Sequence, residues 1–220
     1  MNNLVSLKYL DDYRLAVVND AVRSCFADLN ISRIIKPRSK ILLKINTPGA
    51  YAPDQAKTTH PDIVRGIVDV LTEMNVSVTV IDSPYGKYSQ EDLEKVYLET
   101  GMLDMANKTK CELNHNLHTY TQEVPNGKML KFVELLYEIN NADCIINVGK
   151  VNIDEKFGYI GAINNIFGFV PGDRKLQLIN RIASTDGYND AILDIYSVIS
   201  DKLVLNIMDG VVGRQANRTQ

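Results

Sequence analysis

The chain has 220 residues, 45% of them hydrophobic and 23% charged, which is typical of one globular domain with a full core. Its formal net charge of -3 and the absence of a basic stripe argue against nucleic acid as a partner. It shows neither a basic, then apolar leader nor an apolar run near the roughly 20 residues of a membrane span. We therefore expect a soluble cytoplasmic protein without membrane contact.

The three cysteines, Cys25, Cys111 and Cys144, lie far apart in the sequence, and none forms a C-x-x-C pair. An iron–sulfur cluster or a structural zinc site needs four soft ligands close together, which these cysteines alone do not supply. We expect buried free thiols, no iron–sulfur ligands in this chain, and a cofactor that the sequence leaves unknown.

Residues 12–29 place apolar side chains three and four residues apart, which predicts an amphipathic helix. Residues 41–45 form a nearly continuous apolar run, typical of a strand buried on both faces of a parallel sheet. The run Thr59-His60-Pro61-Asp62 then predicts a helix start, in which Thr59 caps the first amides and Asp62 reaches back. An apolar stripe continues this helix to Met74.

Residues 76–81 predict a second strand, which ends at Asp82-Ser83-Pro84, and residues 89–92 repeat the capping pattern. Asn126-Gly127 lies between two strand-like runs and predicts a β-hairpin. Residues 143–148 predict a buried strand, residues 159–167 a short helix stopped by Gly168, and residues 188–200 a further helix. A last strand over 203–208 ends at Asp209-Gly210.

This alternation predicts a three-layer α/β fold in a single domain over residues 1–220: a mostly parallel sheet with helices on both faces and a β-hairpin insertion. Ligands of such sheets bind beyond the carboxyl ends of the strands, where the strand order reverses. The strand ends here carry Lys44 and Asn46, Asp82 and Ser83, Asn147 and Lys150, and Asp209. We expect these groups to share one edge of the sheet.

Each candidate has a functional and a structural interpretation. Lys44 and Lys150 can hold an anionic substrate or act as bases, or they can extend to solvent. Asp82 can bind a ribose hydroxyl or a metal, or form a turn. His60 can be a general acid or base, or its ring can simply pack. His115 and His118 lack a neighbouring carboxylate or thiol, so we predict no metal site.

The short motifs resemble, in their order, the domain-of-unknown-function 362 family from about residue 38 to 213. They are Lys44-x-Asn46, Thr58-Thr59-His60-Pro61, Asp82-Ser83-Pro84, Ile145-Ile146-Asn147 with Lys150, Asn165-x-Phe167-Gly168 with Pro171-Gly172, and Asp209-Gly210. The resemblance implies an α/β domain, found in many members beside a ferredoxin-like iron–sulfur module, and redox or small-molecule chemistry.

The chain also departs from this family pattern. After Lys150 the family usually shows a second lysine and then a histidine, where this chain has Asn152 and Asp154. A later Lys-Asn pair is Asn164-Asn165 here, the ferredoxin-like module is missing, and relatives continue beyond the Asp-Gly strand. An amide neither carries the lysine charge nor transfers a proton efficiently. We therefore expect a divergent member, truncated relative to its relatives, with lost or altered chemistry.

Three hypotheses follow. The chain is an enzyme of redox-related metabolism acting on a small anionic metabolite, a non-catalytic binding or accessory domain, or a degenerate structural unit. The partners we expect are a small-molecule ligand and a redox partner protein. The predicted catalytic residues are Lys44, His60 and Lys150, and the predicted ligand-binding residues are Asn46, Thr58, Thr59, Asp82, Ser83, Asn164, Asn165, Gly168 and Asp209.

Overall fold

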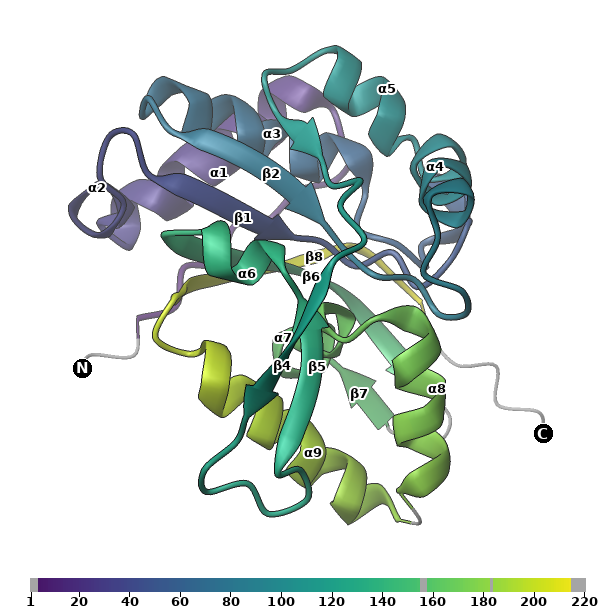
Figure 1. The fold of residues 1–220 in the computed structure, drawn as a ribbon. Coiled ribbons are helices and arrows are strands. Elements are labelled where there is room, and N and C mark those ends of the chain that lie inside the picture. The colour runs from purple at the N-terminus through teal and green to yellow at the C-terminus, as the bar shows by residue number, and fades with distance from the viewer. Residues whose placement is uncertain (1–3, 155–157, 183, 215–220) are drawn as a thin grey trace.

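A mostly parallel six-stranded sheet organises the protein (Figure 1). The computed structural model describes residues 4–154, 158–182 and 184–214. The parallel strands are β1 (Lys40–Lys44), β2 (Ser77–Ile81), β3 (Glu112–Leu113), β6 (Cys144–Asp154) and β8 (Leu203–Arg214), in the spatial order β3-β2-β1-β6-β8. The short β7 (Gly158–Ile160) runs antiparallel to β6. Because the chain runs outward from β1 to β3 and then returns to β6 beside β1, the strand order reverses between β1 and β6.

The central strands are buried because apolar side chains point to both faces. In β1, Ile41 and Leu43 belong to one core cluster, whereas Leu42 between them belongs to the other. In β6, Ile146 and Ile145 divide between the clusters in the same way. This alternation, which has a period of two residues, gives the sheet two separate apolar faces.

The first face is covered by helices from the N-terminal half, shown in purple, blue and teal in Figure 1. They are α1 (Leu15–Asp28), α2 (Ile31–Ile34), α3 (Pro61–Glu73), α4 (Gln90–Glu99) and α5 (Met102–Asn107). Val18 and Val22 of α1 and Val64 and Ile67 of α3 share a core with the first face of β1. A 3-10 turn, η1 (Pro53–Gln55), lies in the irregular stretch before α3.

The second face packs against elements from the C-terminal half and the hairpin (Figure 1). These are the strands β4 (Thr119–Glu123) and β5 (Phe132–Leu136), the helices α6 (Glu138–Asn141), α7 (Ala162–Asn165), α8 (Gly172–Arg181) and α9 (Thr185–Ile199), and the 3-10 helix η2 (Ile166–Phe169). Phe169 of η2 and Ile195 of α9 are fully buried in this second core.

The predicted α/β class, parallel sheet and hairpin insertion are confirmed. Three local predictions are wrong. Thr59 does not cap α3: the cap is His60, whose side chain accepts from the Asp62 amide, while Thr59 bonds elsewhere. Residues 159–167 form part of β7, then α7 and the start of η2, and Gly168 lies inside η2 instead of stopping a helix. Asp209-Gly210 lies within β8, which continues to Arg214.

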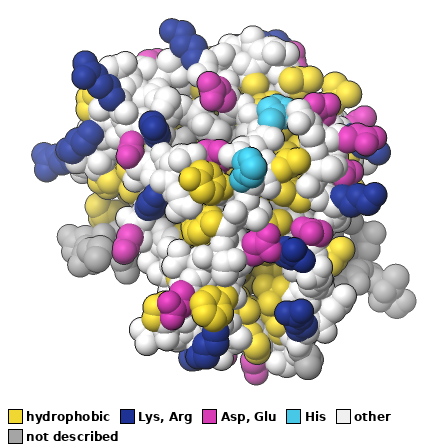
Figure 2. All heavy atoms as spheres, in the orientation of Figure 1, with side chains coloured by type: hydrophobic (Ala, Val, Ile, Leu, Met, Phe, Trp, Pro, Cys, Tyr) yellow, Lys and Arg dark blue, Asp and Glu magenta, His cyan; other side chains and the backbone are white. Residues whose placement is uncertain are grey.

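The surface and the thiols agree with parts of the compositional analysis. Figure 2 shows positive and negative side chains interspersed over one face of the molecule instead of gathered by sign. The three cysteines are free, and each is partly rather than fully buried. In the described part of the chain, no helix is both long and apolar enough to cross a membrane.

The contact between α1 and α3 depends on Gly66. A Cβ at this position would lie 2.6 Å from Val18 Cγ1 and 2.9 Å from Asn19 Oδ1. We expect Gly66→Ala to destabilise the protein, because overpacking costs about 1–3 kcal/mol, more than the roughly 1 kcal/mol gained in helix propensity. Urea unfolding measures the effect, and adding Val18→Ala should recover part of the loss. Additive losses in the double variant would contradict this contact.

Candidate functional site

The predicted polar groups do meet at the carboxyl edge of the sheet, but they form two clusters on opposite faces. Lys44 follows Leu42 on the second face and contacts η2. Lys150 follows Ile146 and Val148 on the first face and contacts Tyr13, just before α1. The groups thus share one edge of the sheet but not one face, because alternate residues of neighbouring strands point to different faces.

The cluster on the second face is a closed ion pair. Lys44 has an exposed fraction of 0%, and its Nζ lies 2.7 Å from Asp82 Oδ1. The same ammonium group donates to the Ile45 carbonyl at 2.5 Å and to Asn165 Oδ1 at 3.3 Å. Asp82 Oδ2 accepts from both the amide and the hydroxyl of Thr47. Burial lowers the pKa of Lys44, and attraction to Asp82 opposes that shift.

Gly168 and a chain of amides seal this pair. A Cβ at Gly168 would overlap Lys44 Nζ and Asp82 Oδ1, so only glycine lets η2 approach so closely. Asn165 Nδ2 donates to Asn147 Oδ1 at 2.7 Å, and Asn147 in turn donates to the Ala162 carbonyl and to Asn206. The polar groups of the cluster are thus mutually satisfied, and the arrangement holds η2 and α7 against the sheet.

The cluster on the first face joins four elements. Lys150 Nζ donates to Asp209 Oδ2 at 2.9 Å and to the Tyr13 hydroxyl at 2.8 Å. Asp209 also accepts from the Tyr13 hydroxyl at 3.1 Å and from the His60 amide at 3.0 Å. Burial and the nearby Asp209 carboxylate raise the pKa of Tyr13, which keeps its hydroxyl protonated. Like Lys44, Lys150 is fully paired.

His60 is the candidate that faces open space. Its ring stacks on the Tyr13 ring, with centroids 3.7 Å apart and planes 7° apart. Its Nδ1 accepts from the Asp62 amide at 3.2 Å, and burial lowers its pKa, an effect that Asp62 and Asp209 partly oppose. The ring is therefore neutral at pH 7, with Nδ1 as acceptor and the proton on Nε2.

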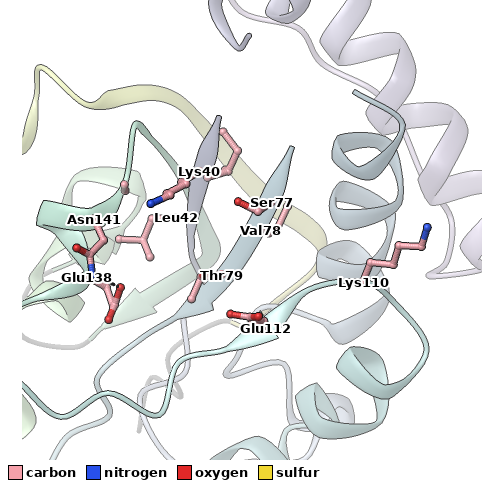
Figure 3. A pocket seen from close by; sticks show the side chains of 11 residues that line it. Lys40, Leu42, Ser77, Val78, Thr79, Lys110, Glu112, Glu138 and Asn141 are labelled. Carbon is pink, nitrogen blue, oxygen red and sulfur yellow. Dashed lines mark hydrogen bonds between the residues drawn. The ribbon is translucent and has the colours of Figure 1, made fainter. Parts of the chain in front are cut away.

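A cavity of about 460 Å³ opens beside this ring. Its walls are Tyr13, Ala52, Pro53, Asp54, Ala56, His60 and Val212. A second cavity, of about 510 Å³, lies at the opposite end of the strands, where Lys40 and Ser77 begin β1 and β2 (Figure 3). In that view Lys110 and Glu112 lie near β3, with Glu138 and Asn141 on α6. Only the smaller of these two cavities adjoins predicted site residues.

The remaining candidates do not converge on either cluster as ligand groups. Asn46 and Thr59 bond to each other's backbone, and Thr59 Oγ1 donates to the Val148 carbonyl, which closes the loop before α3. Thr58 Oγ1 is buried without a hydrogen-bond partner among the described residues. Asn164 is half-buried on α7.

Among the residues that depart from the family pattern, Asn152 Oδ1 accepts from the Ile153 amide. The side chain of Asp154 lies outside the described part of the structure. Within that part, no group of three or more His, Cys, Asp or Glu side chains is placed to hold a metal.

Two residues in or near these clusters carried no sequence signal: Tyr13 of the first-face cluster, and Lys175, which bonds to the residue after Asp82. Tyr13 precedes a helix in a segment without a motif, and its role depends on a contact with β8, 196 residues away. Lys175 lies on α8 in the polar run Gly172–Arg181, yet its exposed fraction is 3% and its Nζ donates to the Ser83 carbonyl. A lysine in a polar helix normally lies in solvent, so only the structure identifies it.

We expect the loss of Asp82 to destabilise the protein mainly because it leaves Lys44 without its partner. Asp82→Asn leaves a buried ammonium without its carboxylate, so we expect the free energy of unfolding to fall by about 3–5 kcal/mol. Adding Lys44→Met should reduce that loss, because it removes the unpaired charge. Urea unfolding of the single and the double variant measures this coupling, with the exposed Arg23–Glu73 pair as a control in which Glu73→Gln changes little. Equal losses in the single and double variants would contradict it.

Comparison with known proteins places these observations in a family. The chain is 21% identical over 216 residues to a thylakoid-associated protein of Synechocystis sp.. The match covers 97% of this chain and 64% of that protein, so the chain spans less than two thirds of its relative. The sequence model of the family described as domain of unknown function (DUF362) matches residues 41–220. The chain therefore belongs to the DUF362 family.

Proposed function

We propose that this protein binds a small anionic metabolite in the cavity beside His60, at the carboxyl ends of the strands. The observation that carries the proposal is the neutral His60 ring on the cavity wall. Its described hydrogen bond uses Nδ1, which leaves Nε2–H to donate to an oxygen atom of a ligand. The stacked Tyr13 and the fixed cap of α3 hold the donor in one orientation.

The position of His60 at the start of α3 favours negative charge. The dipole of this 13-residue helix attracts anions to its start, although Pro61 has no amide hydrogen and the amides of Asp62, Ile63 and Val64 already bond to His60. Ala52, Pro53, Ala56 and Val212 supply an apolar wall, so a compact ligand with an apolar body and one carboxylate or phosphate fits the lining. Asp54 lies exposed on this wall and acts against an anion.

The proposal moves the expected charge recognition away from Lys44 and Lys150, because each of these ammonium groups already has a carboxylate partner. Binding without turnover is the function we favour. A redox role and a redox partner protein remain predictions that rest on the family resemblance, and a cytoplasmic location remains a prediction from the composition of the chain.

Proton-transfer catalysis at the same site is a second candidate. One observation favours it: the ring of His60 lies against Tyr13, whose hydroxyl joins Lys150 and Asp209 in a buried hydrogen-bonded group. If the site is catalytic, Tyr13→Phe should lower turnover of a bound ligand with little effect on its affinity. Loss of affinity alone would assign Tyr13 a positioning role.

A thermal-shift screen of the purified protein against dicarboxylates, keto acids and sugar phosphates tests the binding proposal. For a ligand that raises Tm, His60→Ala should weaken binding about tenfold or more, which corresponds to the roughly 1.4 kcal/mol of one hydrogen bond to a charged group. Asp54→Asn should strengthen it, because the substitution removes a like charge from the wall. His118→Ala, which removes a histidine before β4, is the matched control.

Two outcomes would refute the proposal. One is the absence of any Tm shift across the panel at millimolar ligand, because a ligand that binds the native state must stabilise it. The other is a ligand whose affinity is the same in wild type, His60→Ala and Asp54→Asn.

A further inference from the structure

Helix α8 docks onto the sheet through a lysine. Its two buried residues are Gly172 and Lys175, whereas Leu178 and Ile179 are only partly buried and Leu176 is exposed. An amphipathic helix ordinarily buries apolar side chains, and a lysine is almost never fully buried unless it is paired. The burial of Lys175 therefore needs an explanation other than packing.

Among the described residues, two other lysines are buried, and Lys175 lacks the partner that both of them have. Lys44 and Lys150 each lie within 3 Å of a carboxylate oxygen, at 2.7 and 2.9 Å. Among the described residues, Lys175 forms no ion pair: its Nζ donates to the Ser83 carbonyl and lies 5.1 Å from the centre of the Tyr85 ring. The Asp82 carboxylate nearby is already occupied by Lys44 and by backbone amides.

The side chain of Ser83, whose carbonyl accepts from Lys175, is also without a matching partner among the described residues. Ser83 has an exposed fraction of 1%, and its Oγ has no hydrogen-bond partner among the described residues. Buried polar groups are ordinarily bonded, and each exception calls for a missing partner. An ammonium group with donors to spare and an unbonded hydroxyl, both at Ser83, are complementary to a negatively charged oxygen.

We propose that Lys175 Nζ and Ser83 Oγ form an oxyanion subsite under α8, on the face of the sheet opposite the His60 cavity. The ligand group is a sulfate, phosphate or carboxylate, which would supply the counter-charge that Lys175 lacks. This subsite goes beyond the proposed function and does not depend on it, because the two sites share no residue.

The charges around Lys175 make this binding depend on pH. Burial lowers its pKa to about 7, Asp82 opposes the shift, and the Lys44 ammonium adds to it. A substantial part of the molecules therefore lacks this proton near pH 7, and an anion should draw a proton onto the amine. Because only the protonated amine supplies the charge, anion affinity should fall as the pH rises through 7.

Entry to the subsite involves the start of α8. Gly172 packs closely against the carbonyl oxygens of Pro84 and Gly86, and Gly86 has a φ of +106°. The contact that closes the subsite is thus between backbone segments, with few fully buried apolar side chains behind it. A helix held in this way opens locally at low cost, which gives an anion a path to Lys175.

Calorimetric titration with sodium sulfate tests the proposal, because sulfate keeps a constant charge between pH 6 and pH 9. Wild type should bind sulfate at pH 6 and about a hundredfold more weakly at pH 9, as expected for a required group with a pKa of about 7. Lys175→Met should abolish binding, and Ser83→Ala should weaken it. Lys202→Met, which removes a lysine that also donates to backbone carbonyls, should leave binding unchanged.

Two further measurements keep the proposal falsifiable if Lys175→Met fails to fold. Titration of wild type at pH 7 in two buffers of different ionisation enthalpy should show net proton uptake when sulfate binds. His60→Ala should bind sulfate at this subsite like wild type, which separates it from the His60 cavity. No saturable sulfate binding at pH 6, as expected if a buried water satisfies both donors, or binding without proton uptake would overturn the proposal.

Discussion

The Lys44–Asp82 ion pair is the constraint on which the carboxyl edge of the second face depends. It is buried at the point where the strand order reverses, and it joins β1 to the end of β2. A buried pair is stable only when its remaining donors and acceptors are bonded, which here requires Thr47, the Ile45 carbonyl and Asn165. That requirement explains why η2 begins after Asn165 and passes over the pair at a glycine.

The need to bond every buried polar group also distinguishes the two faces of the sheet at this edge. On the second face, the amides and carboxylates around Lys44 and Asp82 use one another's hydrogen bonds, so the position beside this pair is filled by protein. On the first face, Lys150 and Asp209 hold Tyr13 and the start of α3 together but leave the His60 ring beside a cavity. The reversal of strand order thus fixes where polar groups collect, and their hydrogen bonding decides which of them a ligand can reach.

Most of the strands and helices of the sheet and its covering layers could be predicted from the sequence because their signals are local. The apolar runs at β1, β2 and β6, the helical spacing of α1 and α3, and the turn at Asn126-Gly127 reflect backbone and burial preferences within a few residues. The way in which the candidate site residues group in space was less predictable from the sequence. The cap at His60 instead of Thr59, the division of Lys44 and Lys150 between two faces, and the contact of Tyr13 with β8 each depend on partners distant in sequence.

The three lysines that are buried in the described part of the chain show how a structural and a functional explanation can be separated. Replacing a buried ion pair with apolar residues is often neutral or stabilising, so the burial of Lys44 and Lys150 does not by itself indicate a ligand. The carboxylates of Asp82 and Asp209 supply the counter-charge for these two ammonium groups, so their burial needs no ligand to explain it. Lys175 has a carbonyl and an aromatic ring instead of a carboxylate, next to a serine hydroxyl without a partner. Of the three, it is the lysine whose burial the described protein atoms leave uncompensated, and this imbalance, more than burial itself, points to a missing anion.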